Sequence, residues 1–525
     1  MTDSLESTPN PNIICVDCKK AFNLTSKEIA FYEDRGLILP KRCSDCRQKK
    51  KIEKAYLEIS KKWSVEAKKE PLEYFYNVDE MAQLQNGEKT FVIGRKGSGK
   101  TSIAQHLNKN NPANSFSRFL SFKNFPFQIL YSLENSREYT TPNQYISIWK
   151  YLIYSKICTM MIHNENIDIT IRTKLSKLYN DDSSQALDKL IKKWTSTGFG
   201  VEILGCGFNI AGEQYSKDLS WLEIVDILEN IIIDYCDKST YYIIFDELDE
   251  DYKNFPSVVE ANRYKDMITS LFKCICDIRS KFKDEELLVY PIAFLRSDIY
   301  DQITDSDKNK WYESVINLEW NTDKIKRLLA HRICVAFSVP DKPFDEAWSL
   351  LFSRDMVKMG TRKTKEMAIY DYIERSTEMR PRDFIKYIQE CVILANKKAE
   401  HPITPETVKD SDENFSEYLK RETIDELYAI LPEISDIFGL LSTIRKQRFS
   451  FSDFEIEYNN QVDQGILPPN DVKRVLLMLF DAGVIGNIPR IKTKSIFKFS
   501  GNSPRFNYNE TMIIHRGLFK SLQIF

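Results

Sequence analysis

The sequence predicts an α/β fold built around one parallel sheet, because two short β-prone runs each end in polar residues suited to ligand binding. The first run, Phe91–Ile93, leads into a glycine-rich turn and a segment that reads as a helix. The second run, Tyr241–Phe245, is followed by four acidic residues within five positions. Parallel sheets bind ligands at the carboxyl ends of their strands, where both polar segments are expected. Paired cysteines near the N-terminus predict a separate small domain stabilised by a metal ion.

The composition is that of an ordinary globular protein, with 42% hydrophobic and 29% charged residues in a chain of 525. This length suggests roughly three domains. The formal net charge of −2 excludes a general attraction to nucleic acid, so such contacts must come from local basic patches. No apolar run approaches the roughly 20 residues that span a bilayer. The first residues lack the basic and apolar regions of a signal peptide, so we expect a cytoplasmic protein with no membrane partner.

The glycine-rich turn matches the phosphate-binding loop G-x-x-x-x-G-K-[ST], with Gly94, Gly99, Lys100 and Thr101 at its four fixed positions. The glycines let backbone N–H groups face one point, and the following helix adds the positive end of its dipole. We expect Lys100 to reach the β- and γ-phosphates and the Thr101 hydroxyl to ligate Mg²⁺. The residues predicted to bind the nucleotide are Gly94, Arg95, Lys96, Gly97, Ser98, Gly99, Lys100 and Thr101.

The acidic segment after the second run predicts the remaining catalytic groups. Asp246 is expected to hold Mg²⁺, directly or through water, and Glu247 to polarise the water that attacks the γ-phosphate. Asp249 lies close enough in sequence to share the role given to Glu247, and the choice between these two acids stays open.

Three arginines are candidates for sensing the γ-phosphate. Arg296 follows the apolar run Leu287–Leu295, which reads as the next strand of the sheet. Arg380 and Arg382 flank Pro381, which suits the first position of a helix, and two arginines there can clamp phosphate. For all three, an ion pair with a neighbouring carboxylate is the alternative.

Four cysteines, Cys15, Cys18, Cys43 and Cys46, form two C-x-x-C pairs separated by 24 residues. They supply the four thiolates of a closed tetrahedral zinc site, whereas a redox pair or unrelated core cysteines would be the alternatives. Between them Ser26 is the expected N-cap of a helix ending before Gly36. The other seven cysteines are expected to be small buried hydrophobes.

The segment Lys41–Lys69 carries eleven Lys and Arg against four acids. Its later part predicts a helix with Ile52, Tyr56, Ile59 and Trp63 on one face. A solvated connector and a nucleic-acid contact through phosphates are both open interpretations. The polar, glycine-containing stretch 163–218 reads as an insertion whose purpose the sequence does not reveal.

The C-terminal part predicts a winged helix: helices over Ile434–Ile444, to about Val462 and over Asp471–Ala482, then a hairpin in the alternating stretches 491–499 and 505–509. The candidate DNA contacts are Lys473 and Arg474 in the third helix and Arg490, Lys492 and Lys494 in the wing. Protein contacts are the alternative use of such a domain.

Two resemblances extend these inferences. Residues 12–50, with Cys-Val-Asp-Cys and Lys-Arg-Cys-x-x-Cys-Arg, resemble a zinc-ribbon module found at the N-termini of many bacterial proteins. Residues 72–525 resemble bacterial P-loop ATPases of the AAA+/STAND type through Ile-Gly-Arg-Lys-Gly-Ser-Gly-Lys-Thr, Ile-Phe-Asp-Glu-Leu-Asp-Glu, Phe-Leu-Arg-Ser-Asp-Ile-Tyr and Arg-Pro-Arg-Asp. The second resemblance implies a RecA-like αβα core, a helical lid, a C-terminal winged helix, and ATP instead of GTP. It also implies a setting in bacterial antiphage defence, because many relatives are encoded in or near defence loci.

We therefore expect a zinc ribbon (1–50), a basic helical linker (51–71), a P-loop core (72–320), a helical lid (321–425) and a winged helix (426–525). The predicted function is an ATP-hydrolysing switch, with ATP, Mg²⁺ and Zn²⁺ as cofactors, that senses or acts on nucleic acid, DNA more than RNA. The alternative is a nucleotide-dependent scaffold with little turnover that recruits an effector protein. A nucleotide-dependent homo-oligomer is also expected.

Overall fold

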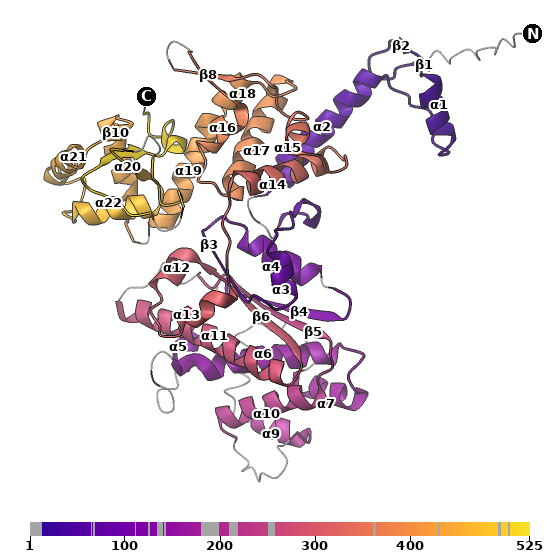
Figure 1. Cartoon of the computed structure of the whole chain (residues 1–525), viewed down its shortest axis with the longest axis vertical. Coiled ribbons are helices and arrows are strands. Elements are labelled where there is room, and N and C mark those ends of the chain that lie inside the picture. Colours follow the sequence, from indigo (N-terminus) through magenta and orange to yellow (C-terminus); the bar gives the residue numbers. More distant parts are fainter. Residues whose placement is uncertain are drawn as a thin grey trace, which may run out of the picture. The chain divides into compact units, whose positions relative to one another are not determined.

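The structure is a computed structural model of the whole chain (Figure 1). It describes residues 13–524 except 65, 67–68, 111, 124–126, 134–139, 141–142, 180–198, 209–218, 250–257, 361–363, 429, 492–494 and 502–503. The chain divides into two compact units. The first comprises Met1–Ser64, Lys326–Arg375 and Ile385–Phe415, and the second comprises Val65–Ile325, Ser376–Phe384 and Ser416–Phe525.

A five-stranded parallel sheet forms the centre of the second unit, in the order β4-β5-β6-β3-β7. Its strands are β3 (Phe91–Gly94), β4 (Ser115–Ser121), β5 (Thr240–Asp246), β6 (Leu288–Arg296) and β7 (Val315–Asn317). The two apolar runs of the sequence are β3 and β5, and β6 lies between them in the sheet. The predicted parallel sheet is therefore confirmed.

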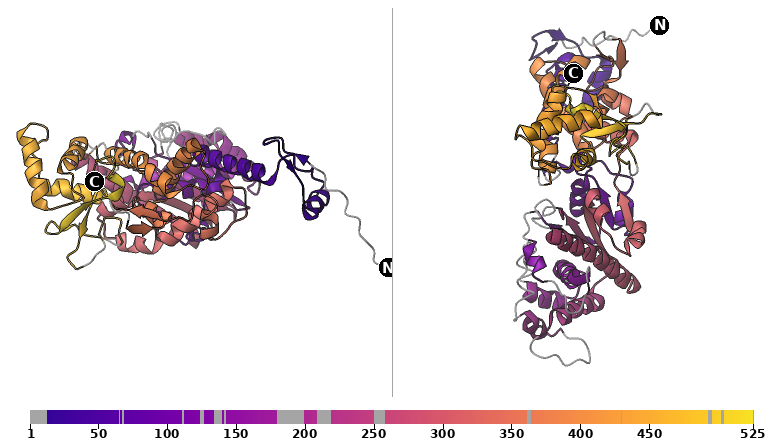
Figure 2. Two further views of the ribbon diagram at one scale, coloured as in Figure 1. Left: turned by 90° about the horizontal axis from the view of Figure 1, so that it is seen from above. Right: turned by 90° about the vertical axis from the view of Figure 1, so that its left-hand side faces the viewer.

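Helices cover both faces of this sheet (Figures 1 and 2), so successive side chains of β5 are buried on opposite faces. Tyr241, Ile243 and Phe245 pack with helices α6 (Ile146–Ile162), α10 (Trp221–Tyr235) and α11 (Val258–Asp284). Tyr242 and Ile244 pack with α3 (Met81–Gln85) and α4 (Lys100–Lys109) on the other face. This arrangement is the predicted αβα core.

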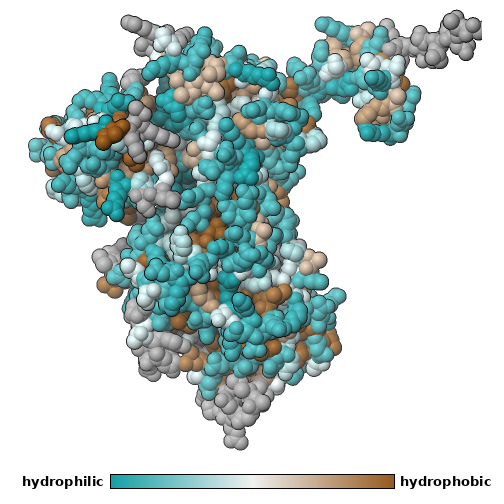
Figure 3. Space-filling model, in the orientation of Figure 1, coloured by the Kyte–Doolittle hydropathy of each residue, from teal (hydrophilic) through white to brown (hydrophobic). Residues whose placement is uncertain are grey.

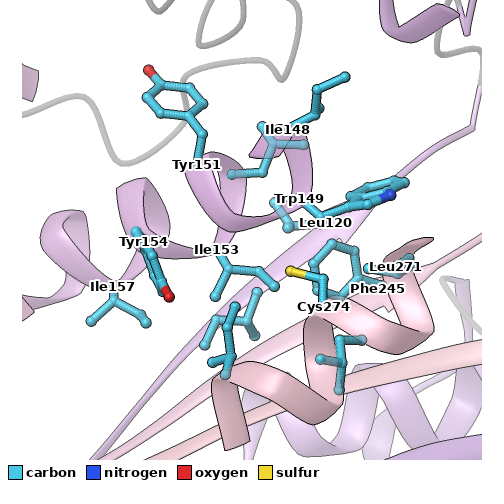
Figure 4. Packing of buried hydrophobic residues seen from close by; sticks show 14 of the residues in the cluster. Leu120, Ile148, Trp149, Tyr151, Ile153, Tyr154, Ile157, Phe245, Leu271 and Cys274 are labelled. Carbon is cyan, nitrogen blue, oxygen red and sulfur yellow. The ribbon is translucent and has the colours of Figure 1, made fainter. Parts of the chain in front are cut away.

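Helix α6 is buried around its whole circumference, as Figure 4 shows for its packing against β4, β5 and α11. Its Trp149 indole N–H donates to the backbone oxygen of Met267 at 2.9 Å. The outer side of α6 is covered by α7 (Ile169–Tyr179) and α9 (Phe199–Gly205), which bury Leu175, Leu178, Phe199 and Ile203. The described parts of the predicted insertion therefore complete the core.

The first unit joins the N-terminal cysteine module to a group of helices. Strands β1 (Ile13–Ile14) and β2 (Ala21–Phe22) pair antiparallel and precede α1 (Ser26–Glu33) and α2 (Ser44–Lys62). The remaining elements of this unit are α14 (Thr322–Ala336) from Lys326 on, α15 (Phe344–Trp348), β8 (Val357–Met359), β9 (Lys365–Met367), α16 (Ile369–Glu374), α17 (Pro381–Lys398) from Ile385 on, and α18 (Pro405–Asp410). Helix α19 (Asp412–Leu427) begins in this unit and belongs to the second unit from Ser416 on. The Tyr56 hydroxyl of α2 donates to the backbone oxygen of Glu400 at 3.0 Å, and Ile59 and Trp63 are buried.

The predicted N-cap of α1 was wrong by one residue. Thr25, not Ser26, caps the helix, because its hydroxyl accepts from the backbone N–H of Glu28 while the Glu28 carboxylate accepts from the backbone N–H of Thr25. This reciprocal capping box satisfies two donors that Ser26 would leave unpaired. Gly36 follows α1 with φ +61°, a conformation that favours glycine.

The C-terminal part of the second unit contains α20 (Ile434–Ile444), β10 (Arg448–Phe449), α21 (Phe451–Asp463), α22 (Val472–Asp481), β11 (Ile485–Ile488) and β12 (Thr511–Ile514). Its antiparallel sheet has the order β10-β12-β11. This part therefore contains three helices and a three-stranded antiparallel sheet, and its assignment as a winged helix stays a prediction.

The strand positions predicted for this sheet were wrong. The strands lie outside the alternating stretches 491–499 and 505–509, because Ile485 and Met512 are fully buried whereas Ile491 is 98% exposed. Within those stretches Ile496 makes an isolated bridge to Asn487. Lys492 and Lys494 lie outside the described residues.

None of the helices within the described ranges is long and apolar enough to cross a bilayer.

Removing the Trp149 side chain should destabilise the core. Trp149→Ala leaves a cavity under α6 and removes the hydrogen bond to the Met267 oxygen, so we expect the free energy of unfolding to fall by about 3–5 kcal/mol in denaturant titration. Ile169→Ala is the matched control, because this side chain is 63% exposed and its loss should change stability by less than about 0.5 kcal/mol. Equal effects of the two substitutions would contradict the packing described here.

Candidate nucleotide site and metal centre

The sheet brings the separate predicted segments to one edge. Gly94 at the end of β3 lies in register with Arg296 at the end of β6, and Asp246 at the end of β5 lies in register with Ser121 at the end of β4. Because all four strands are parallel, their carboxyl ends meet at the same edge. The phosphate loop, the acidic segment and Arg296 are therefore neighbours.

The loop between β3 and α4 adopts a backbone that only glycine accommodates well. Gly97 and Gly99 have φ +81° and +96°, in the left-handed region. A Cβ at Gly94 would lie 2.6 Å from the Ser98 hydroxyl, and one at Gly97 would lie 3.2 Å from the Cβ of Arg382. Both approaches are too close to be accommodated without a shift of the neighbouring atoms. The glycines chosen from the motif are thus required by local geometry.

Lys100 begins α4 and folds back over the loop. Its ammonium group donates to the backbone oxygens of Gly94 at 2.7 Å and Arg95 at 3.0 Å. Burial lowers the pKa of Lys100 to about 8, although the carboxylates of Asp249 and Asp246 act in the opposite direction. The cation is thus placed at the loop but is held by neutral carbonyls.

Asp246 and Thr101, the two predicted Mg²⁺ ligands, lie together. Burial raises the pKa of Asp246 to about 6, while a hydrogen bond from the Thr101 hydroxyl opposes that rise. Among the described residues, Asp246 Oδ2 and the Ser98 hydroxyl are buried polar atoms with no hydrogen-bond partner. Buried polar atoms without partners are costly, and oxygens beside a phosphate loop suit a hard cation and its phosphates. The residues present therefore fit a magnesium–nucleotide ligand.

Glu247 has an unusual backbone and a defined side-chain contact. Its φ of +61° is rare for a residue with a side chain. The Ser121 hydroxyl donates to the Glu247 carboxylate from the end of β4. Strand β4 lies on one side of β5, and the phosphate loop follows β3 on the other side, beyond β6. Ser121 thus holds the carboxylate toward the side of β5 that faces away from the loop.

Arg296 is buried among carboxylates. It pairs with Asp298 at 2.6 Å, Glu426 at 3.5 Å and Asp249 at 3.6 Å. Burial alone would lower its pKa, but these acids raise the pKa of Arg296 above its ordinary value. The carboxylate pairing that the sequence left as an alternative is therefore present in this structure.

The cations of the loop and of the α17 start are also paired. Arg380 pairs with Asp383 at 3.0 Å and Glu378 at 3.5 Å, and donates to the backbone oxygen of Lys96 at 3.4 Å.

Arg382 pairs with Glu422 at 2.9 Å, and Lys96 pairs with the same oxygen of Glu422 at 3.4 Å. A further ion pair joins Arg95 of the loop to Glu378. The structure therefore brings both predicted arginines, Arg380 just before α17 and Arg382 in its first turn, to the phosphate loop.

Four residues at this site were missed by sequence reasoning: Ser121, Glu378, Glu422 and Glu426. None of the four belongs to a recognised motif, and each is brought to the site by the folding of the chain. Glu422 and Glu426 lie four positions apart on α19, which places them on one face of the helix. The spacing alone could have predicted that the two acids share a helix face. Nothing in the sequence predicts that this face meets a loop more than 300 residues away.

The four cysteine sulfurs of the N-terminal module lie within 4.8 Å of one another. The sulfurs of Cys18 and Cys43 are 3.8 Å apart, close to the separation of about 3.8 Å expected for tetrahedral Zn–S bonds of 2.3 Å. Cys43 is the N-cap of α2 and Cys46 lies in its first turn, so the second pair comes from a helix start and not from a second hairpin. The donor set and its geometry fit zinc, as the spacing predicted.

Helix α2 presents unpaired positive charge opposite its buried face. Lys51, Lys54 and Lys61 are exposed, lie three and seven positions apart, and make no ion pair with any described residue. By contrast, Lys50 pairs with Asp17 at 3.9 Å and Lys62 with Glu58 at 2.7 Å. The surface of this helix is mostly hydrophilic in Figure 3.

The candidate nucleic-acid contacts of the C-terminal domain lie at the surface. Lys473 and Arg474 are exposed on α22, and Arg490 is exposed after β11. The Lys473 ammonium lies 5.9 Å from the ring centre of Tyr508, whose hydroxyl donates to the backbone oxygen of Lys473. Asp481 on the same helix pairs with Lys498 at 3.0 Å. The exposed face of α22 is thus of mixed charge.

Comparisons with known proteins match two parts of the chain. Residues 11–55 match a family described as a probable treble clef domain, and residues 323–423 match the FunZ-associated C-terminal helical domain. The first match contains all four cysteines of the N-terminal module. The zinc ribbon expected from the sequence is therefore a zinc module of the treble-clef kind.

Among curated proteins, a putative transposon gamma-delta 80.3 kDa protein of Escherichia coli (strain K12) is 22% identical over 462 residues. The match covers 82% of this chain and 62% of that protein, so the chain spans less than two thirds of its relative. Two solved structures are similar at 12% identity. Cdc6p from Pyrobaculum aerophilum has a TM-score of 0.29 over 92% of this chain and 94% of that chain. Drosophila ORC bound to DNA has a TM-score of 0.22 over 100% and 97%. Both TM-scores are too low to support an inference about this chain.

Removal of zinc should unfold the N-terminal module. In Cys18→Ser we expect the bound zinc, measured by atomic absorption on the purified protein, to fall from about one ion per chain to less than a tenth. Cleavage by protease within residues 13–50 should rise in parallel. Cys206→Ser is the control, because Cys206 lies outside the module and should leave the zinc content unchanged. Full zinc content in Cys18→Ser would contradict a four-cysteine site.

Proposed function

We propose that this chain is an ATP-binding and ATP-hydrolysing switch that acts on nucleic acid. The observation that carries the proposal is the convergence of Lys100, Thr101, Asp246 and Arg296 at the ends of adjacent parallel strands. The orphaned oxygens of Ser98 and Asp246 add polar groups suited to phosphate and Mg²⁺. The preference for ATP and the defence setting remain predictions from the family resemblance.

Each residue has a defined task in this proposal. Lys100 leaves the carbonyls of Gly94 and Arg95 to bind the β- and γ-phosphates, while the loop N–H groups orient them. Thr101 and Asp246 would hold Mg²⁺, which when bound neutralises charge on the phosphates. Arg296 and Arg382 would stabilise the charge that develops on the γ-phosphate, and Arg380 would support the bound phosphates.

Glu247 is proposed as the group that orients the attacking water. In this structure the Glu247 carboxylate accepts a hydrogen bond from Ser121 at the end of β4, so that hydrogen bond must be released before the carboxylate can act. Asp249 is engaged by Arg296 at 3.6 Å, which makes it the less available of the two acids. The same restraint on Glu247 favours a second candidate function, a nucleotide-dependent scaffold with little turnover that recruits an effector protein.

Nucleic acid is the proposed partner because two separate surfaces offer cations to phosphates. The unpaired lysines of α2 form one surface, and Lys473, Arg474 and Arg490 of the C-terminal domain form the other. The name of the Escherichia coli relative refers to a transposon, which agrees with a role on DNA. The nucleotide-dependent homo-oligomer and the effector protein remain predictions.

Phosphate release from ATP tests the catalytic assignment. We expect turnover by the wild-type chain to rise on addition of single- or double-stranded DNA, and Glu247→Gln to reduce it by at least about 100-fold because the general base is lost. Lys100→Ala should abolish ATP binding, and Asp249→Asn should retain most turnover. Unchanged hydrolysis in Lys100→Ala would refute the proposal, whereas ATP binding without turnover under every condition would favour the scaffold.

Salt-dependent DNA binding tests the surface of α2. We expect Lys51→Ala/Lys54→Ala/Lys61→Ala to lower the slope of log affinity against log salt by about one unit per lost phosphate contact. The control is Lys177→Ala/Lys281→Ala/Lys283→Ala, which removes the same charge from exposed positions on α7 and α11. Equal slopes in the two triple variants, measured by fluorescence anisotropy, would show that α2 is a solvated connector.

A further inference from the structure

The acids of α19 occupy cations that a nucleotide would need. Glu422 holds Arg382 at 2.9 Å and Lys96 at 3.4 Å through one carboxylate oxygen. One turn along the helix, Glu426 lies 3.5 Å from Arg296. The three cations come from the start of α17, the phosphate loop and the end of β6, so two acids of one helix bridge all three segments.

These ion pairs are shielded enough to have energetic weight. The side chains of Glu422 and Glu426 are each 26% exposed, whereas that of Arg296 is only 6% exposed. Burial acts to raise the pKa of Glu422, but Lys96 and Arg382 outweigh burial and lower it, so the acid is held as the anion. Partly buried pairs are screened less by salt than pairs on an open surface.

We infer that Glu422 and Glu426 form a carboxylate latch, which fills the place of phosphate charge at the loop and is displaced when ATP binds. The inference rests on the proposed function, since it requires ATP to bind at this loop. A cation that forms a close ion pair with a latch carboxylate cannot at the same time bind a phosphate equally closely. The latch and the phosphates therefore compete for Lys96, Arg296 and Arg382.

The latch is connected to the C-terminal domain through α19 itself. The Ser416 hydroxyl accepts from the backbone N–H of Ser521 at 2.9 Å, near the C-terminal end of that domain. A Cβ at Gly517 would lie 2.6 Å from the Leu419 side chain and 2.3 Å from the Ser376 oxygen, so this contact is close. Arg95 of the loop also lies 5.3 Å from the ring centre of Phe499. Release of the latch would therefore free the segment that holds the C-terminal domain against the loop.

Charge-neutral substitution of the two acids separates the latch from simple packing. Glu422→Gln and Glu426→Gln keep the shape of the side chains and remove the competing charge. We expect each to tighten ATP binding roughly three-fold and the double variant roughly ten-fold, measured by fluorescent-nucleotide displacement. Glu417→Gln on the same helix is the matched control, because Glu417 forms no ion pair with a described residue. Unchanged or weaker binding in the double variant, with the control like wild type, would overturn the latch.

A second measurement does not depend on turnover or on ATP affinity. Hydrogen exchange of the α19 amides in 418–427 should be faster in the nucleotide-free double variant than in wild type and Glu417→Gln. Addition of ATP to wild type should accelerate the same amides. If no variant binds ATP, the proposed function fails, while exchange in the nucleotide-free protein still decides whether the two acids restrain α19. Equal exchange in wild type and the double variant would overturn the inference.

Discussion

Mutual repulsion among the cations gathered at the phosphate loop is the constraint on which this site depends. Lys100 is held by backbone oxygens, and the other five cations each pair with at least one carboxylate. Those five are Arg95, Lys96, Arg296, Arg380 and Arg382. Like charges this close would destabilise the folded state if they were left uncompensated. The carboxylates come from segments after β5 and β6, from the start of α17 and from α19, so compensation ties these segments to the loop.

The sequence predicted those parts of the site that depend on the backbone conformation or burial of neighbouring residues in the chain. The turn after β3 needs left-handed residues at Gly97 and Gly99, and such a requirement is visible as glycine. The strands β5 and β6 are continuous apolar runs because both of their faces are covered. Apolar residues at helical spacing predicted the helices α20, α21 and α22. Ser450, just before α21, is the capping residue at the start of that helix.

The sequence did not predict contacts between residues far apart in the chain, or strand positions that are decided by which side chains are buried. The contact between Ser121 and Glu247 joins residues 126 positions apart, and no motif encodes it. The strands β11 and β12 were misplaced because alternation of Lys with aromatic residues imitates a strand, whereas burial of Ile485 and Met512 decides the pairing. The cap at Thr25 was a different kind of miss, since its Thr-x-x-Glu signature was present and was overlooked.

The pKa shifts of Lys100 and Asp246 would give the proposed nucleotide binding a proton uptake or release whose sign changes with pH. Burial lowers the pKa of Lys100, so phosphate bound at the loop would favour the protonated form and draw a proton onto this side chain. Burial raises the pKa of Asp246, so a divalent cation bound there would favour the carboxylate and expel a proton. Binding should therefore consume protons on the alkaline side of neutrality and release them on the acidic side. The observed heat of binding would then depend on the ionisation enthalpy of the buffer, with opposite slopes at the two ends of that range.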